Sequence, residues 1–221
     1  MKTLFRAFVC LLPWSLRRRV LCRCFGYQIH PKTHIGLAWV FPEKLVMKEH
    51  TRIRHLTVVK GLDLVSLGEY ASIGRLNWIT AYPSQALPYF AHVPERRPEL
   101  LLGAHASISH RHIIDCTERV SIGRFSTFAG FRSQILTHSI DLAASRLDAK
   151  PVSIGEYCFV ATACTLLGGA SLPHHSVLGA NSLLDEDYSE SYRLYCGVPA
   201  KPVAELDRDL AYFKRLQGLV I

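Results

Sequence analysis

The stretch ILTHSID, residues 135 to 141, places a histidine and an aspartate three residues apart. Neutral imidazole has a reference pKa of about 6.5, so His138 could take the proton of a hydroxyl group near neutral pH. We expect Asp141 to bind the other ring nitrogen and to fix its tautomer, as an orienting carboxylate does in other histidine-dependent sites. The chain has eleven histidines, however, and a loop histidine is more often structural than catalytic. The two residues therefore define a candidate general base whose role depends on its position in the fold.

A period of six in residues 153 to 184 indicates the scaffold that must position this histidine. A bulky aliphatic residue recurs at every sixth position, and a small side chain follows four residues after each of the first five. The aliphatic positions are Ile154, Val160, Leu166, Leu172, Leu178 and Leu184, and the small ones are Cys158, Cys164, Ala170, Ser176 and Ser182. Such short repeats predict a parallel β-helix, in which three hexamers make one triangular coil with the aliphatic residue pointing inward.

The same period recurs upstream and is interrupted twice. It is visible in residues 67 to 79, 102 to 114 and 122 to 128, and the interruptions are residues 80 to 101, with four prolines, and residues 133 to 151, with His138. Excursions from a regular scaffold tend to carry binding groups. We expect Gly155 and Gly179, each directly after an aliphatic position, to adopt corner dihedrals that other residues avoid.

The N-terminal segment carries most of the net charge of +8, because residues 1 to 42 hold seven Lys or Arg and no acid. This distribution is not that of a protein that wraps nucleic acid, and we expect no nucleic-acid partner. One apolar helical face before Pro13, with Trp14 and the arginines at 17 to 19, favours peripheral contact of residues 1 to 24 with an anionic membrane surface. Packing on the chain itself or on a neighbouring subunit is the alternative. The longest uncharged apolar run, residues 7 to 16, is about half of what spans a bilayer.

Three regions follow from these patterns. They are a basic amphipathic segment (1–26), the β-helix domain (27–202) and a C-terminal α-helix (203–221), where Leu206, Leu210 and Phe213 trace one face. The seven cysteines are scattered without a CxxC motif, and two of them fill small-residue positions of the repeat. This usage favours a reducing, cytoplasmic location rather than a disulfide framework. Together with the basic N-terminal segment, it predicts a peripheral position at the inner face of the cell membrane.

The repeat resembles the hexapeptide signature of left-handed β-helix acyltransferases, among them serine, maltose, galactoside and polysaccharide O-acetyltransferases. The passage from "IGEYCFVATACTLLGGASLPHHSVLGANSLL" to "GVPAKPV" is similar to the closing part of that family. The resemblance covers about residues 60 to 203. It implies an all-β, left-handed parallel β-helix, a homotrimer with active sites between subunits, and acetyl-coenzyme A as acyl donor. The left hand is implied by the resemblance alone, since parallel crossovers in general favour the right hand.

The resemblance also implies a site. A histidine in the same loop is the general base of the family's sugar O-acetyltransferases, and His138 matches it by position and by its Thr-His context. The final coils of the family imply coenzyme contacts at Ala161 and Ala180, and Lys201 of GVPAK could meet a coenzyme phosphate. Where the family often has Thr-Lys, this chain has Asp185 and Glu186. The implied function is O-acetylation of a sugar or glycan, for instance a lipid-linked one, in polysaccharide or lipopolysaccharide biosynthesis.

Three alternatives stay open. The first is N-acylation of a nucleotide-linked amino sugar with the same fold and base. The second is a zinc hydratase similar to hexapeptide-fold carbonic anhydrases, for which the pairs His105/His110 and His50/His55 have a suitable spacing. A tetrahedral zinc site needs a third protein ligand that the sequence does not indicate, so we expect no metal. The third is a scaffold without catalysis.

Overall fold

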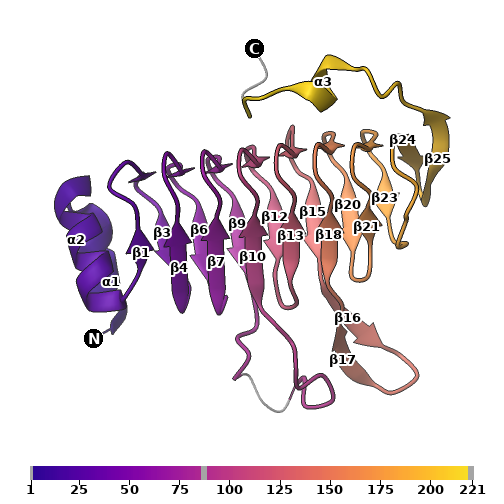
Figure 1. Ribbon diagram of the computed structural model, residues 1–221. Coiled ribbons are helices and arrows are strands. Elements are labelled where there is room, and N and C mark those ends of the chain that lie inside the picture. The colour runs from indigo at the N-terminus through magenta and orange to yellow at the C-terminus, as the bar shows by residue number, and fades with distance from the viewer. Residues whose placement is uncertain (1, 86–88, 219–221) are drawn as a thin grey trace.

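The computed structural model describes residues 2–85 and 89–218 of the 221-residue chain. Short strands wind into a three-faced prism, in which successive coils each add one strand to each face (Figure 1). A pair of helices covers the N-terminal end of the prism, and a short helix lies near its C-terminal end. The predicted parallel β-helix with helical segments at both ends is confirmed.

Each face of the prism is a parallel sheet. The first sheet contains β1 (Gln28–Ile29), β4 (Lys44–Met47), β7 (Leu64–Leu67), β10 (Glu99–Leu102), β13 (Val120–Ile122), β18 (Val152–Ile154) and β21 (Ser171–Leu172). The second contains β2 (His34–Ile35), β5 (Arg52–Ile53), β8 (Ser72–Ile73), β11 (Ser107–Ile108), β14 (Thr127–Phe128), β19 (Phe159–Val160), β22 (Val177–Leu178), β24 (Arg193–Gly197) and an antiparallel last strand, β25 (Ala200–Glu205). The third contains β3 (Trp39–Phe41), β6 (Val58–Lys60), β9 (Trp78–Thr80), β12 (Ile113–Asp115), β15 (Gln134–Leu136), β20 (Thr165–Leu167) and β23 (Leu183–Leu184).

The period-six aliphatic residues form the core, because the strand register stacks them in ladders inside the prism. Ile154 lies between Ile122 and Leu172 in the first sheet. The equivalent position of the second sheet, Val160, is paired with Phe128 and Leu178. All of these side chains are buried and belong to one continuous hydrophobic cluster. The cluster makes the prism a rigid scaffold, since apolar burial stabilises every coil.

The glycines at the corners have a different role from the predicted one. Left-handed dihedrals occur two residues later, at Tyr157 (φ 55°) and Asn181 (φ 58°), whereas Gly155 and Gly179 are not in this region. A Cβ added to Gly155 would lie 2.5 Å from the backbone nitrogen of His174 in the next coil. Gly155 is therefore required by the close approach of stacked coils and not by its own dihedral angles.

Two helices, α1 (Lys2–Leu11) and α2 (Trp14–Phe25), form the N-terminal segment. The buried guanidinium of Arg17 donates hydrogen bonds to the carbonyl oxygens of Gly36 (2.7 Å) and Ala38 (2.6 Å) in the first coil. This arginine fixes α2 on the end of the prism. None of the helices among the described residues has the length and apolar character needed to cross a membrane.

Both interruptions of the repeat leave the prism at the corner between the third and first sheets (Figure 1). The first begins after β9 and ends before β10, and we call residues 81–98 the proline-rich excursion. The second, between β15 and β18, contains an antiparallel hairpin formed by β16 (His138–Asp141) and β17 (Arg146–Ala149). The repeat therefore extends slightly further into both interruptions than the sequence predicted.

The C-terminal helix is shorter than predicted. Strand β25 continues to Glu205, and the helix α3 covers Ala211–Lys214 alone, while residues 219–221 of the predicted helix lie outside the described residues. The segment runs along the corner between the first and second sheets, where the hydroxyl of Tyr212 donates to the carbonyl of Cys158 (2.9 Å). Near its end, the backbone N–H of Gly218 donates to the ring of His105 (3.2 Å).

Candidate active site

His138 begins the hairpin directly after the chain leaves the third sheet. Its strand β16 pairs with β17 so that His138 lies opposite Ala149. The side chain is 31% exposed, which leaves part of the ring accessible beside the prism. A regular strand ends immediately upstream, so the rigid scaffold determines the position of this loop residue.

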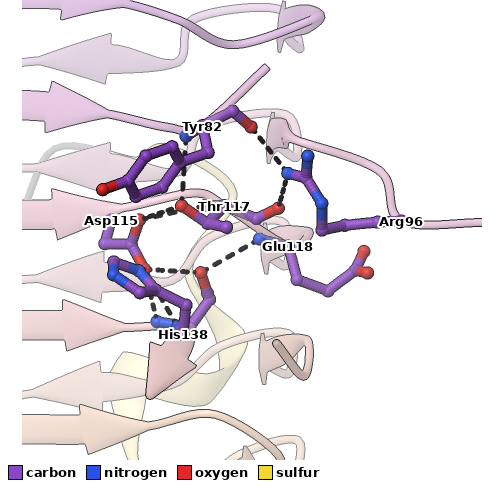
Figure 2. Close-up of polar contacts among 7 residues, drawn as sticks. Tyr82, Arg96, Asp115, Thr117, Glu118 and His138 are labelled. Carbon is purple, nitrogen blue, oxygen red and sulfur yellow. Dashed lines mark hydrogen bonds and ion pairs between the residues drawn. The ribbon is translucent and has the colours of Figure 1, made fainter. Parts of the chain in front are cut away.

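The carboxylate of Asp115 holds the imidazole of His138. Oδ2 of Asp115 lies 2.7 Å from Nδ1 of His138. Figure 2 shows how the two side chains face each other. Asp115 is the last residue of β12, which pairs with β15 so that Asp115 lies opposite Leu136. The two functional residues are thus 23 positions apart in the sequence but belong to adjacent coils.

The Asp115 carboxylate is buried (7% exposed) and well supplied with donors. Its Oδ1 accepts hydrogen bonds from the backbone N–H (3.1 Å) and hydroxyl (2.6 Å) of Thr117. Its Oδ2 accepts from the backbone N–H (2.9 Å) and hydroxyl (2.7 Å) of Thr137 and from the backbone N–H of His138 (3.0 Å). Burial acts to raise the pKa of Asp115, but hydrogen bonds from His138, Thr117 and Thr137 outweigh it, so the pKa is lowered. The residue is an ionised carboxylate in a fixed orientation.

The hydrogen bond to Asp115 raises the pKa of His138 above its ordinary value, against the opposing effect of burial. When Nδ1–H donates to the carboxylate, the neutral tautomer carries its lone pair on Nε2. An imidazole in this state can accept a proton at Nε2, and the nearby carboxylate stabilises the imidazolium that results. The pair is therefore suited to general base chemistry on a hydroxyl or amine.

The predicted orienting role of Asp141 is wrong, because Asp115 takes it. Residues three apart in a strand point to opposite faces, so His138 and Asp141 of β16 diverge. Oδ1 of Asp141 instead accepts the backbone N–H groups of Ala143 (3.0 Å) and Ala144 (3.1 Å), which stabilises the hairpin turn. The overlooked signal was IIDCT, residues 113 to 117, in which an acidic residue occurs within the repeat one coil before His138.

Two aromatic rings of the proline-rich excursion face the imidazole. The ring of Tyr82 lies 5.5 Å from that of His138 and perpendicular to it (89°). Phe90 makes a similar perpendicular contact at 6.4 Å. The excursion and the hairpin therefore meet at the candidate base, although their sequences are far apart.

The predicted coenzyme contacts lie elsewhere on the prism. Ala161 and Ala180 occur in successive coils at the corner between the second and third sheets, a different corner from that of His138. The ammonium of Lys201, in β25, is 2.6 Å from the carboxylate of Glu186. The two alanines therefore lie at the same corner, which is not the corner of His138 in the same chain. Lys201 forms an ion pair with Glu186.

Several other histidines have structural partners. The rings of His50 and His105 stack on either side of Tyr70, with centroid distances of 4.6 and 4.8 Å. The ring of His110 accepts the backbone N–H of Arg75 (2.8 Å). Among the described residues, no group of three or more His, Cys, Asp or Glu side chains is arranged to hold a metal ion.

No protein-family model and no curated protein matches this sequence. Solved structures do match. The polysialic acid O-acetyltransferase OatWY shares 15% identity over 81% of this chain and 84% of its own, with a TM-score of 0.60. A hexapeptide-repeat-containing acetyltransferase from Vibrio cholerae O1 biovar eltor, in complex with acetyl coenzyme A, shares 20% identity over 64% of this chain and 70% of its own (TM-score 0.51). A point mutant of AntD, an N-acyltransferase from Bacillus cereus, in complex with dTDP and coenzyme A, shares 12% over 85% and 88% (TM-score 0.54). The chain therefore has the left-handed β-helix fold of hexapeptide-repeat acetyltransferases.

Proposed function

We propose that this protein is an acyltransferase that moves the acetyl group of acetyl-coenzyme A to a hydroxyl group of a sugar in a cell-surface polysaccharide or lipopolysaccharide. The observation that carries the proposal is the His138–Asp115 pair, with its 2.7 Å contact at the edge of the prism. The shared fold supports it, because sugar O-acetyltransferases are among the similar solved structures. Fold alone does not determine chemistry, so the argument depends on the pair.

The transfer needs no covalent enzyme intermediate. The acceptor oxygen attacks the thioester carbonyl while its proton passes to Nε2 of His138. The new C–O bond forms, the C–S bond breaks, and the departing coenzyme A thiolate takes the proton back from the imidazolium. Asp115 holds Nδ1–H throughout and stabilises the positive charge that develops on the ring. The products are the acetyl ester and free coenzyme A, with His138 again neutral.

A homotrimer is part of the proposal, because donor contacts and base lie on different corners of one chain. The outer face of the third sheet supports association, since Trp78 and Ile113 are paired across β9 and β12 and are each about half exposed. Phe131, at the neighbouring corner, is 52% exposed. Exposed apolar patches of this kind mark protein interfaces. A second copy on this side would place a His138 near the Ala161 and Ala180 corner of its neighbour.

Peripheral membrane contact at the inner face of the cell membrane is also proposed. The apolar side of α1 turns away from the prism, with Leu4, Phe8 and Leu11 exposed by 78, 60 and 74%. Arg19 and Arg23 of the adjoining helix are exposed as well. Apolar and basic groups together suit an anionic lipid surface. Replacing Phe8 and Leu11 by serine should abolish sedimentation with phosphatidylglycerol vesicles, and unchanged sedimentation would contradict this contact.

N-acylation of a nucleotide-linked amino sugar is the second candidate, favoured by the similarity to AntD. A neutral amine also needs a base when it attacks a thioester, so His138 and Asp115 would serve the same roles. The acceptor distinguishes the two functions.

The decisive experiment measures thioester cleavage of acetyl-coenzyme A in the presence of single acceptors. Maltose, oligosialic acid and methyl glycosides supply hydroxyl groups, and a dTDP-linked amino sugar supplies an amine. We expect acetyl transfer to at least one hydroxyl acceptor, with loss of transfer in His138→Ala. Turnover with the amine alone would select the second candidate. Metal analysis of the same preparation tests the zinc hydratase.

A further inference from the structure

Arg96 is a buried arginine in the proline-rich excursion that the proposed reaction does not use. Its side chain is 5% exposed, and its guanidinium binds three backbone carbonyl oxygens. Nη1 donates to Tyr82 (2.6 Å) and Thr117 (2.6 Å), and Nη2 donates to Pro83 (2.6 Å). Figure 2 shows the guanidinium bridging Tyr82 and Thr117. A buried charge is costly unless such partners compensate it, so this arrangement is a specific one.

The three carbonyl groups belong to two different parts of the chain. Tyr82 and Pro83 begin the excursion, whereas Thr117 follows the strand that carries Asp115. A second link runs in parallel, because the backbone N–H of Tyr82 donates to the Thr117 hydroxyl (3.2 Å), which itself donates to Asp115. Arg96 therefore ties the excursion to the same residues that orient the candidate base.

The guanidinium also fixes the second aromatic ring. Its central carbon lies 4.5 Å from the centroid of the Phe90 ring, a cation–π contact. The ring of Tyr82 is 5.7 Å from that of Phe90, so the two rings are neighbours. Both rings are perpendicular to the imidazole of His138. One buried arginine thus determines the position of two rings beside the proton-accepting group.

The hairpin that begins at His138 contacts the excursion. The ring of His92, in the excursion, lies 3.5 Å from the carboxylate of Asp148 in β17, which links the two elements. An exposed aromatic ring beside a few directed polar groups suits a small organic ligand. A sugar ring presents C–H groups on one face and hydroxyl groups at its edge, so it can contact the exposed ring of Tyr82 while directing a hydroxyl to His138.

We propose that Tyr82, with the buried ring of Phe90 packed behind it, forms the acceptor-binding surface, supplied by the same protomer as His138, and that Arg96 is the positioning residue that holds both rings. This inference depends on the proposed function and deepens it, because it assigns the acceptor, and not the coenzyme, to the excursion. Arginine is preferred at position 96, because its planar guanidinium reaches separate carbonyl groups with two nitrogens and faces the Phe90 ring, whereas a lysine ammonium is a compact point charge.

The test compares Arg96→Met with Arg97→Met, which removes the adjacent but exposed cation. Steady-state acetyl transfer to maltose, oligosialic acid and methyl glycosides is measured with each substrate varied in turn. We expect Arg96→Met to raise the KM of the acceptor by about tenfold or more, with the KM of acetyl-coenzyme A within about twofold of wild type. Arg97→Met should leave both values near those of the wild type. A purely structural role of Arg96 would change both KM values together.

A second pair of variants keeps the inference testable if Arg96→Met does not fold. Tyr82 is 41% exposed, so its replacement leaves the core intact. Tyr82→Leu should raise the acceptor KM, and Tyr82→Phe, which keeps the ring, should not. If Tyr82→Leu and a folded Arg96→Met leave the acceptor KM unchanged while wild-type transfer is normal, the inference is overturned and the proposed function stands. If the wild-type protein acetylates none of these sugars, both fail.

Discussion

Two corners of the prism use histidine in opposite ways. Along the corner between the first and second sheets, seven rings stack in sequence with centroid distances of 4.6 to 5.2 Å. We call them the aromatic stack: His50, Tyr70, His105, Phe125, Tyr157, His175 and Tyr192. At the corner between the third and first sheets, the repeat is interrupted, and the ring of His138 is held by a carboxylate rather than stacked between two parallel rings.

The difference is visible in the direction of the pKa shifts. Burial lowers the pKa of His105 and of His175 in the aromatic stack, so both favour the neutral form. The hydrogen bond to Asp115 raises the pKa of His138. The same side chain is thus a packing ring where the coils are regular and the proposed proton acceptor where they are not. The environment, and not the residue type, assigns the role.

Replacement of His138 by alanine tests this contrast most strongly. We expect acetyl transfer to fall by about 10²- to 10⁴-fold in kcat, because the proposed general base is lost. The matched control is His175→Phe, which keeps a ring in the aromatic stack and should retain near wild-type kcat. Equal activity of the wild type and His138→Ala, measured by thiol release from acetyl-coenzyme A, would remove the catalytic half of the comparison.

Asp115→Asn should have the next largest effect. The amide keeps the shape of the side chain but not its charge, and the imidazole remains, so we expect kcat to fall by about 10²- to 10³-fold, in the lower part of the range for general base catalysis. Without the carboxylate the pKa of His138 decreases, and the acidic limb of the pH–rate profile should shift to lower pH. Asp141→Asn, in the hairpin turn, is the control and should leave the acidic limb in place.

Acid should destabilise the fold through its buried neutral histidines. Burial lowers the pKa of His112 to about 4, and its Nδ1 accepts the backbone N–H of Ser133 (3.2 Å). Because the unfolded state binds this proton at about pH 6.5, stability decreases as the pH falls from about 6.5 to 4, by about 3 kcal/mol for this residue. His138 acts in the opposite sense, since its stabilising contribution is complete below pH ~6.5 and is lost as the pH rises through its raised pKa.

Urea unfolding at pH values of about 7.5, 6 and 5 measures this dependence. For each protein, the free energy of unfolding at low pH is compared with its own value at the highest pH. The decrease should be smaller in His112→Gln than in the wild type. An equal decrease in this variant would assign the acid sensitivity to other groups.

The smallest effect is expected within the aromatic stack. Tyr157 lies between Phe125 and His175, with centroid distances of 4.7 and 5.2 Å. Tyr157→Leu should lower the free energy of unfolding by about 1–2 kcal/mol through lost ring contacts and leave kcat unchanged. Tyr157→Phe keeps the ring and should cost less. A drop in kcat comparable to that of His138→Ala would show that the two corners are not independent.

Much of the fold could be predicted from the sequence, because a period of six repeated over many coils has one structural solution. Ile154 and Val160 lie in the ladders that the period predicts. The role of the corner glycines was harder to predict from the sequence. Glycine occurs both where a neighbouring coil leaves no room for a side chain, as at Gly155, and where the backbone needs unusual dihedral angles. The C-terminal helix was predicted too long: the buried Phe213 lies in α3, whereas Leu206 and Leu210, which share the same helical spacing, lie before it.

The site was less predictable because its partners meet only through the stacking of coils. His138 was indicated by its loop, but its carboxylate is supplied by the preceding coil. Asp141 was nearer in sequence and points to a different face of its strand. Arg96 likewise contacts Tyr82 and Thr117. The sequence does not indicate these contacts, because the segments are far apart along the chain.

The cover formed by the helix pair has a consequence for the solubility of the rod. Stacked coils end in a row of main-chain groups that would accept another β-strand, and a free sheet edge of this kind invites addition of further chains. Arg17 occupies two of those acceptors, at Gly36 and Ala38, with a side chain that cannot extend the pairing. At the far end, the reversal of β25 against β24 closes the series of parallel strands in the second sheet. Each feature covers main-chain groups at one end of the solenoid and so acts against the addition of further strands there.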